Sequence, residues 1–127
     1  MNTEGRKQKV LIVDDQVDLT TLYRRKLVSE GFEVMQADSG DAGLAKAKDF
    51  RPDLILLDLM MPGLSGFDAI TLFREIIETS NAVIIVLSAL SGPEDIEKAK
   101  AYGADDYIVK SNSSIEDVVE RVKQALL

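Results

Sequence analysis

Carboxylate, hydroxyl and amine side chains follow the short apolar runs of this sequence. They are Asp14 and Asp15 after 10–13, Asp58 after 54–57, Ser88 after 82–87 and Lys110 after 107–109. Clustered carboxylates repel one another unless a cation or a proton lies between them. Mg²⁺ takes few protein oxygens, keeps several waters and leaves positions for phosphate oxygens. These residue types therefore indicate a magnesium site, provided that the fold brings the three aspartates together.

The composition excludes several other kinds of chemistry. The 127 residues include no Cys and no His, which excludes disulfides, thiolate or imidazole metal sites, and catalysis by cysteine or histidine. With 15 basic and 22 acidic residues, the net charge is −7. Such a charge favours a basic partner or a bound cation over a nucleic-acid backbone or an anionic lipid. We therefore expect no direct binding to nucleic acid.

The apolar runs alternate with segments of helical spacing. Runs 10–13, 54–57 and 82–87 are continuous, which is typical of strands covered on both faces, and 32–37 and 107–109 complete a set of five. Helical spacing extends over 19–27, 67–77 and 96–102, where Gly103 is a plausible stop. Five strand–helix repeats predict an α/β fold, a doubly wound parallel sheet with helices on both faces.

The last predicted helix begins with a capping signal. Ser113-x-x-Glu116 has the spacing of a capping box, and apolar residues recur from Ile115 to Leu126. In a parallel sheet the carboxyl ends of the strands lie along one edge, where ligands bind. If the first and third strands are neighbours, the three aspartates converge at that edge.

Each polar residue has an ordinary interpretation when it is taken alone. The aspartates could form turns or cap helices, and the others could be a loop hydroxyl (Ser88), a solvated amine (Lys110) and a partly buried aromatic (Tyr107). Their joint placement at the ends of the apolar runs favours a shared site.

The sequence resembles the receiver domain of two-component response regulators. The resemblance is carried by VLIVDDQ (10–16), PDLILLDLMMPGLSG (52–66), VIIVLSA (83–89) and GADDYIVK (103–110). It implies a flavodoxin-like five-stranded sheet of order 2-1-3-4-5. It also implies a receiver domain over residues 9–127 after a polar N-terminal tail over 1–8, and a signalling module rather than an enzyme.

The resemblance implies a role for the acidic residues. Asp58 would be the phosphoacceptor and a metal ligand. Asp15 would bind Mg²⁺ directly, Asp14 would act largely through water, and Met60 would contribute its backbone carbonyl.

It also implies roles for three residues near the ends of the last two strands. Ser88 would contact the phosphoryl group, and Lys110 would pair with it. Ser88 and Tyr107 would form a switch in which the tyrosine changes rotamer. The family usually has a proline after the lysine, whereas this chain has Ser111. We expect a trans Lys110–Ser111 bond, because a cis bond before serine is costly, and a Lys110 amine within ion-pair reach of Asp58.

The resemblance further implies partners. A histidine kinase or phosphotransfer protein would supply the phosphoryl group, and acetyl phosphate could replace it. A downstream effector would bind the face formed by the fourth helix, the fifth strand and the fifth helix, and a homodimer through this face is an open alternative.

The longest apolar run, 82–87, has six residues, well short of the roughly 20 that span a membrane. We therefore expect a cytoplasmic protein with no membrane segment.

Other functions compete with this interpretation. A receiver-like interaction module that is not phosphorylated is the main alternative. An aspartate-nucleophile phosphatase of the haloacid dehalogenase type needs an Asp-x-Asp pair, whereas Asp14 and Asp15 are adjacent and position 60 is not aspartate. An FMN module would need a hydroxyl- and glycine-rich loop after the first strand, where this chain has DDQVD.

Overall fold

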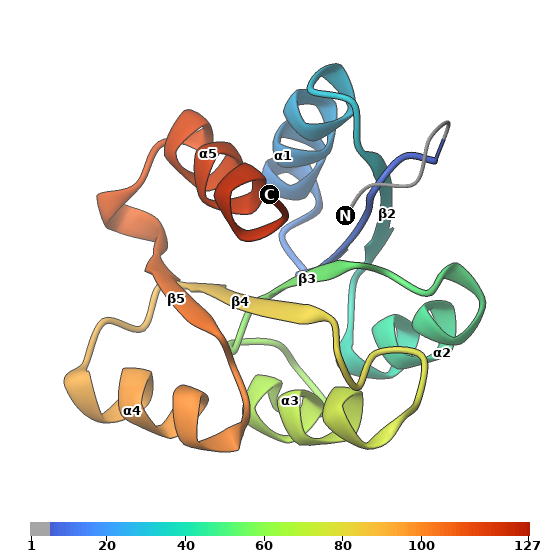
Figure 1. Ribbon diagram of the computed structural model, residues 1–127. Helices are drawn as coiled ribbons and strands as arrows, with labels where there is room; N and C mark the ends of the chain where they lie inside the picture. The colour runs from blue at the N-terminus through green and yellow to red at the C-terminus, as the bar shows by residue number, and fades with distance from the viewer. Residues whose placement is uncertain (1–5) are drawn as a thin grey trace.

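Five parallel strands form the centre of the structure, a computed structural model that describes residues 6–127 (Figure 1). The strands are β1 (Lys9–Val13), β2 (Glu33–Ala37), β3 (Leu54–Leu57), β4 (Val83–Ser88) and β5 (Asp106–Val109). Their order is β2-β1-β3-β4-β5, so β2 and β5 are the edges of the sheet. This order confirms the one that the resemblance implied.

Five α-helices and one 3₁₀ turn connect and cover the strands. They are α1 (Val17–Ser29), α2 (Gly40–Phe50), α3 (Gly66–Glu75), α4 (Pro93–Tyr102), η1 (Lys110–Asn112) and α5 (Ile115–Ala125). Figure 1 shows α1 and α5 on one face of the sheet and α2, α3 and α4 on the other. Helices on both faces, as the sequence predicted, bury the central strands from both sides.

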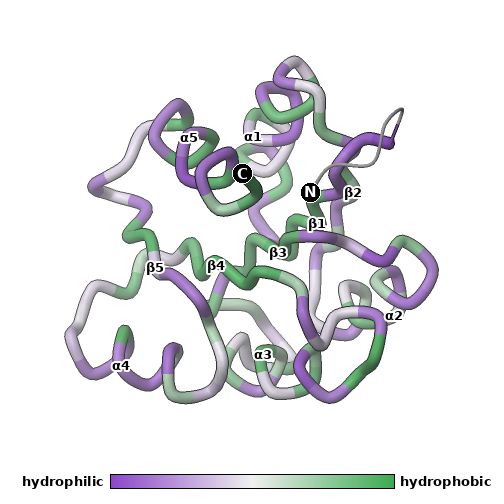
Figure 2. The backbone as a smooth tube through the Cα atoms, viewed as in Figure 1, coloured by the Kyte–Doolittle hydropathy of each residue, from purple (hydrophilic) through white to green (hydrophobic). Residues whose placement is uncertain are grey.

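The continuous apolar strands supply both faces of the core. In β3, Ile55 and Leu57 pack on the side of α2 and α3, whereas Leu54 and Leu56 pack on the side of α1 and α5, and all four positions are buried. Figure 2 shows the central strands as mainly hydrophobic along their length. The alternation of side chains across the sheet explains why these strands carry no polar face.

The third helix is shorter than its apolar spacing predicts. It ends at Glu75, because Ile76 adopts an extended conformation with ψ 139°. The Thr79 hydroxyl donates to the Phe73 carbonyl at 2.5 Å, which satisfies one of the carbonyls at the helix end. Ile77 is 82% exposed. The prediction that this helix continues to Ile77 is therefore wrong.

The cap of the fifth helix lies one residue later than predicted. The Ser114 hydroxyl accepts from the Asp117 N–H at 3.0 Å, and the Asp117 carboxylate accepts from the Ser114 N–H at 3.0 Å. Ser113 is extended and follows η1. The predicted capping box of Ser113 and Glu116 is therefore wrong. The sequence offers two adjacent serines, each followed three residues later by an acidic residue, and the helix begins after the second serine.

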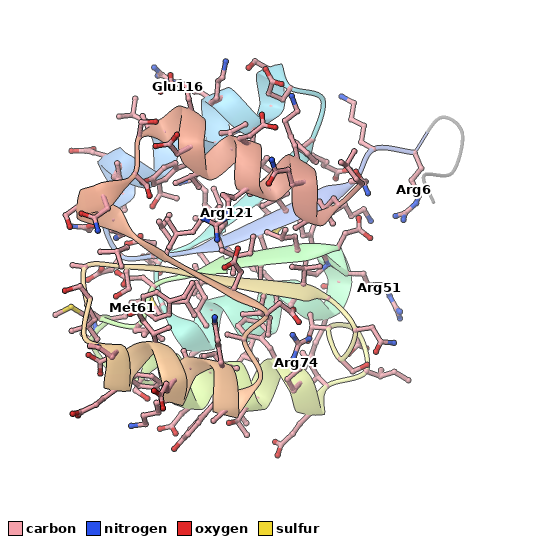
Figure 3. All side chains as sticks on the ribbon, turned by 60° about the vertical axis from the view of Figure 1, so that its left-hand side comes forward. Arg6, Arg51, Met61, Arg74, Glu116 and Arg121 are labelled. Atoms are coloured by element: carbon pink, nitrogen blue, oxygen red, sulfur yellow. The ribbon has the colours of Figure 1, made fainter. Side chains whose placement is uncertain are left out.

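Two side-chain contacts join the region of α5 to β5 and to the residue before β1. Arg121 of α5 pairs with Asp106, the first residue of β5 (Figure 3). Before β1, the side-chain amide of Gln8 donates to the Leu126 carbonyl at 3.0 Å.

The tail expected over 1–8 lies, for its first five residues, outside the described residues, so the domain division stays a prediction. In the described part of the chain, no helix is long and apolar enough to cross a membrane.

Arg74 ties the end of α3 to the loops that precede β4 and β5 (Figure 3). Its guanidinium donates to the Ala82 carbonyl at 2.6 Å and, through two nitrogens, to the Gly103 carbonyl at 3.0 and 2.8 Å. The same group pairs with Asp105 at 2.8 Å, and this carboxylate also accepts from the Ile84 N–H. One side chain thus fixes the starts of two neighbouring strands.

We expect Arg74→Met to lower the free energy of unfolding by about 2–4 kcal/mol, because it leaves the carbonyls of Ala82 and Gly103 without their charged donor. Urea unfolding followed by circular dichroism measures this change. The control Arg24→Met removes an exposed arginine of α1 and should shift the value by less than about 0.5 kcal/mol. Equal losses in the two variants would contradict the role assigned to Arg74.

Candidate functional site

Hydrogen bonds of the sheet continue one residue beyond β1 and β3, and this places two aspartates side by side. The Asp14 N–H donates to the Ala37 carbonyl at 3.0 Å, and the Asp58 N–H donates to the Val13 carbonyl at 2.9 Å. Each of the two aspartates is 4% exposed. Oxygens of Asp14, Asp15 and Asp58 lie within 4.8 Å of one another, and Asp15 is exposed. The predicted convergence of the three carboxylates is confirmed.

The side chains at three strand ends share one local motif. Each accepts a hydrogen bond from the backbone N–H two residues later: Gln16 N–H to Asp14 at 2.9 Å, Met60 N–H to Asp58 at 3.1 Å, and Leu90 N–H to Ser88 at 3.3 Å. Such bonds turn the chain away from the sheet. The same groups therefore end their strands and stand at the carboxyl edge.

The loop after Asp58 depends on close backbone approach. Ser65 caps α3 by accepting from the Asp68 N–H at 3.1 Å. The helix begins so near β3 that a Cβ atom on Gly66 would lie 2.6 Å from the Asp58 carbonyl oxygen. Only glycine fits this position without a shift of the backbone. The start of α3 thus holds the Asp58 backbone in place.

Lys110 brings a positive charge to the acidic cluster. Its amine lies 2.8 Å from Asp14 Oδ2 and 3.4 Å from Asp58 Oδ2, and its side chain is 12% exposed. The amine also donates to Gln16 Oε1 at 2.7 Å. No peptide bond in residues 6–127 is cis. The predictions of a trans Lys110–Ser111 bond and of an amine within reach of Asp58 are both confirmed.

Burial and nearby charges shift the pKa values of Asp58 and Lys110. Burial raises the pKa of Asp58, and the Asp14 carboxylate adds to this, whereas the Met60 N–H and Lys110 partly offset it. Burial alone would lower the pKa of Lys110, but its hydrogen bond to Asp14 and the charges of both aspartates outweigh burial and raise it. The lysine therefore stays an ammonium group. The ionised form of Asp58 is less favourable in the folded protein than in water.

Ser88 and Tyr107 meet at the backbone of Leu90. Ser88 is fully buried, and Tyr107 is 9% exposed with its ring in the core on the α3 side. The Tyr107 hydroxyl donates to the Leu90 carbonyl at 2.7 Å. Since Ser88 accepts from the N–H of the same residue, the segment after β4 connects the serine to the tyrosine. Whether Tyr107 changes rotamer stays a prediction.

An open pocket of about 300 Å³ lies over the cluster. Its lining residues are Asp15, Gln16, Asp58, Met60, Ala89 and Lys110. Sequence reasoning missed Gln16 as a member of this site. The available signal was its place directly after the acidic pair, at the N-cap of α1, where glutamine is not a favoured residue type.

Comparison with known proteins agrees with this geometry. The family model described as the response regulator receiver domain matches residues 10–123. The DNA-binding response regulator MtrA of Mycolicibacterium paratuberculosis (strain ATCC BAA-968 / K-10) is 35% identical over 120 residues, which are 94% of this chain and 52% of that protein. The phosphate regulon transcriptional regulatory protein PhoB of Rhizobium meliloti (strain 1021) is 38% identical over 118 residues, 93% of this chain and 52% of that protein.

Solved structures share the fold. The chemotaxis protein CheY4 of Vibrio cholerae superimposes with a TM-score of 0.87 at 30% identity, over 94% of this chain and 98% of that chain. The chain spans about half the length of the curated relatives it matches.

We expect Asp58→Asn to raise the free energy of unfolding at neutral pH in buffer without divalent cations. Because the pKa of Asp58 is raised by folding, its ionised form weakens the folded state above the ordinary value of 3.8. The gain should therefore shrink as the pH falls towards that value, where the carboxyl is protonated in both states. Urea unfolding at neutral and acidic pH measures the difference. Asp49→Asn, at an exposed carboxylate of α2, is the control, and a variant less stable than wild type at neutral pH would contradict the argument.

Proposed function

The chain belongs to the response regulator receiver domain family, and on this premise we propose that Asp58 accepts a phosphoryl group in a Mg²⁺-dependent reaction. The family makes it a phosphoacceptor signal-relay domain, and a module that is not phosphorylated or a phosphatase is not favoured. One observation carries the assignment to Asp58. Its almost buried carboxylate lies at an open pocket, 3.4 Å from an ammonium group and beside two further carboxylates.

The transfer itself needs little from the protein beyond position and charge. An oxygen of the ionised Asp58 attacks phosphorus, a P–O bond forms, and the bond from phosphorus to the donor breaks. The donor is a histidine kinase or phosphotransfer protein, whose P–N bond breaks, or acetyl phosphate, which leaves as acetate. An ionised carboxylate attacks without a general base, in agreement with a chain that contains no His. Lys110 lies close enough to pair with the phosphoryl oxygens.

The donor atoms of the site suit Mg²⁺. Three carboxylates and one ammonium group leave two net negative charges, which match a divalent cation. Asp15 and Asp58 would hold the ion directly, Asp14 would hold it largely through water, and Met60 would contribute its carbonyl. Oxygen ligands of this kind are those that Mg²⁺ prefers. When bound, the ion neutralises charge on the phosphoryl oxygens.

Ser88 and Tyr107 would carry the signal to the surface. A phosphoryl group on Asp58 adds acceptor oxygens that attract the Ser88 hydroxyl. The bond that this hydroxyl accepts from Leu90 is long, at 3.3 Å, so little is lost when it moves. The Tyr107 hydroxyl donates to the carbonyl of the same residue, Leu90. A shift of the segment after β4 therefore moves the acceptor of Tyr107 and changes the surface formed by α4, β5 and α5. We infer that a downstream effector binds this face.

The remaining assignments are also proposals. One relative is named as DNA-binding, but the present chain matches only about half of it. With a net charge of −7, we infer that this domain does not itself bind nucleic acid. A homodimer through the face of α4, β5 and α5, and a cytoplasmic location, stay predictions.

Intact mass after incubation with Mg²⁺ and acetyl phosphate tests the proposal. We expect the wild type to gain one phosphoryl group, and the gain to disappear with EDTA or in Asp58→Asn. The control Asp49→Asn should still be labelled, because that carboxylate lies on the surface of α2. Labelling that persists in Asp58→Asn would refute the assignment of Asp58. A wild type that no donor labels would favour the module that is not phosphorylated.

We expect slow hydrolysis of the phosphorylated form. In receivers, the side chains two residues after the phosphoacceptor and two after the switch hydroxyl flank the path of the attacking water. Here they are Met60, 53% exposed, and Leu90, and neither can bind and orient water.

The double variant Met60→Asn, Leu90→Glu should therefore lose its phosphoryl group faster, on the order of tenfold or more. The decay of the phosphorylated mass after removal of acetyl phosphate measures the rate. Met60→Leu, which keeps an apolar side chain, is the control and should decay as the wild type does. A double variant that is folded by circular dichroism yet decays no faster would contradict the prediction.

A further inference from the structure

Gln16 is built into the start of α1 by its backbone. Its N–H donates to Asp14 Oδ1 at 2.9 Å. Its carbonyl accepts from the Thr20 N–H at 3.0 Å and from the Thr20 hydroxyl at 2.8 Å. These bonds fix the Cα atom of Gln16 at the rim of the pocket, immediately beside the acidic cluster. The starting point of its side chain is therefore well defined.

The side chain of Gln16 does not serve its own helix. Gln16 is the N-cap residue of α1, yet its side chain accepts no hydrogen bond from the first turn. Its amide oxygen instead accepts from the Lys110 amine at 2.7 Å, across 94 positions of sequence. The contact joins the end of β1 to the end of β5, and neither strand pairs with the other.

The Lys110 amine has three hydrogens and three acceptors. The two near acceptors are Gln16 Oε1 at 2.7 Å and Asp14 Oδ2 at 2.8 Å, and the far one is Asp58 Oδ2 at 3.4 Å. An ammonium group donates at most three hydrogen bonds. The amine is therefore held on the Asp14 side of the pocket, and its interaction with the phosphoacceptor is the longest of the three.

We propose that Gln16 is a positioning residue that holds the Lys110 ammonium group away from Asp58 in the unphosphorylated protein and so leaves the Asp58 carboxylate open to Mg²⁺. The inference rests on the proposed function, because it assigns Asp58 to the metal site. It follows from the unequal distances around the amine.

Loss of the Gln16 acceptor has a defined consequence. The hydrogen that it binds must pass to another acceptor, and the Asp58 carboxylate is already within 3.4 Å of the amine. A charged hydrogen bond at shorter distance is stronger. An ammonium group bound more closely to Asp58 competes with a cation for the same oxygens. The affinity of the pocket for Mg²⁺ should then fall.

Gln16→Met tests the inference, since methionine keeps the length of the side chain and removes the oxygen. We expect its Mg²⁺ dissociation constant, from backbone amide NMR shifts in the metal titration, to rise about two- to tenfold, the net effect of one hydrogen bond exposed to water. Gln16→Asn keeps an amide but is one carbon shorter, so it should resemble Gln16→Met. Gln16→Glu keeps an acceptor at the same reach and should bind Mg²⁺ at least as well as wild type.

Two further readouts separate positioning from a structural defect. The urea midpoint of Gln16→Met should match that of the wild type, because the side chain is exposed and caps nothing. At saturating Mg²⁺, its rate of labelling by acetyl phosphate should return to the wild-type rate. Gln124→Met, at an exposed glutamine of α5, is the matched control and should leave the Mg²⁺ affinity unchanged.

The outcomes distinguish this inference from the proposed function. Unchanged Mg²⁺ affinity in Gln16→Met, with a wild type that binds Mg²⁺ and is phosphorylated, overturns the positioning role and leaves the proposed function intact. This result is expected if water takes the place of the amide oxygen. A wild type that binds no Mg²⁺ overturns the proposed function, and the inference with it.

Discussion

The carboxylates of Asp14 and Asp58, each 4% exposed, share the Lys110 ammonium group at the carboxyl ends of the strands. Charges removed from water are costly unless they are paired and hydrogen-bonded. Asp14 and Asp58 come from neighbouring strands, and Lys110 must reach them from the far side of β4. The sheet order, the tight start of α3 at Gly66 and the turn at η1 all bring these three groups together. Much of the architecture therefore serves to hold Asp14, Asp58 and Lys110 together, because these charged groups would not stay in place without it.

Local geometry and chemistry use the same side chains in this site. Asp14, Asp58 and Ser88 each bind the N–H two residues later and so turn the chain out of its strand. A turn former and a ligand are therefore not competing interpretations of these residues. One oxygen of each aspartate is engaged by the backbone, and the other, Oδ2, faces the lysine. The bond to the backbone fixes the direction of the free oxygen.

The parts of the fold that follow from short-range pattern could be predicted from sequence. Continuous apolar runs predicted the strands, and the polar residues after them predicted the edge at which they meet. The end of α3 could not be predicted, because the Thr79 hydroxyl binds the Phe73 carbonyl there and Arg74 is held by a tertiary hydrogen bond to Gly103. The α5 cap was displaced because the sequence offers two equivalent capping boxes. Gln16 was missed because its partner lies 94 positions away, and its unusual place at the N-cap of α1 does not identify Lys110 as that partner.

The edges of the sheet have a consequence for the solution behaviour of the protein. An open strand presents unpaired backbone groups to which another chain can add, and natural proteins oppose this with short, charged edges. The edge strands β2 and β5 have five and four residues and begin with Glu33 and Asp106. Arg121 lies over the second of these residues as its ion-pair partner, and the molecule carries a net charge of −7. Short strands, an ion pair at one edge and the net negative charge therefore oppose the addition of a second molecule's strand at either edge.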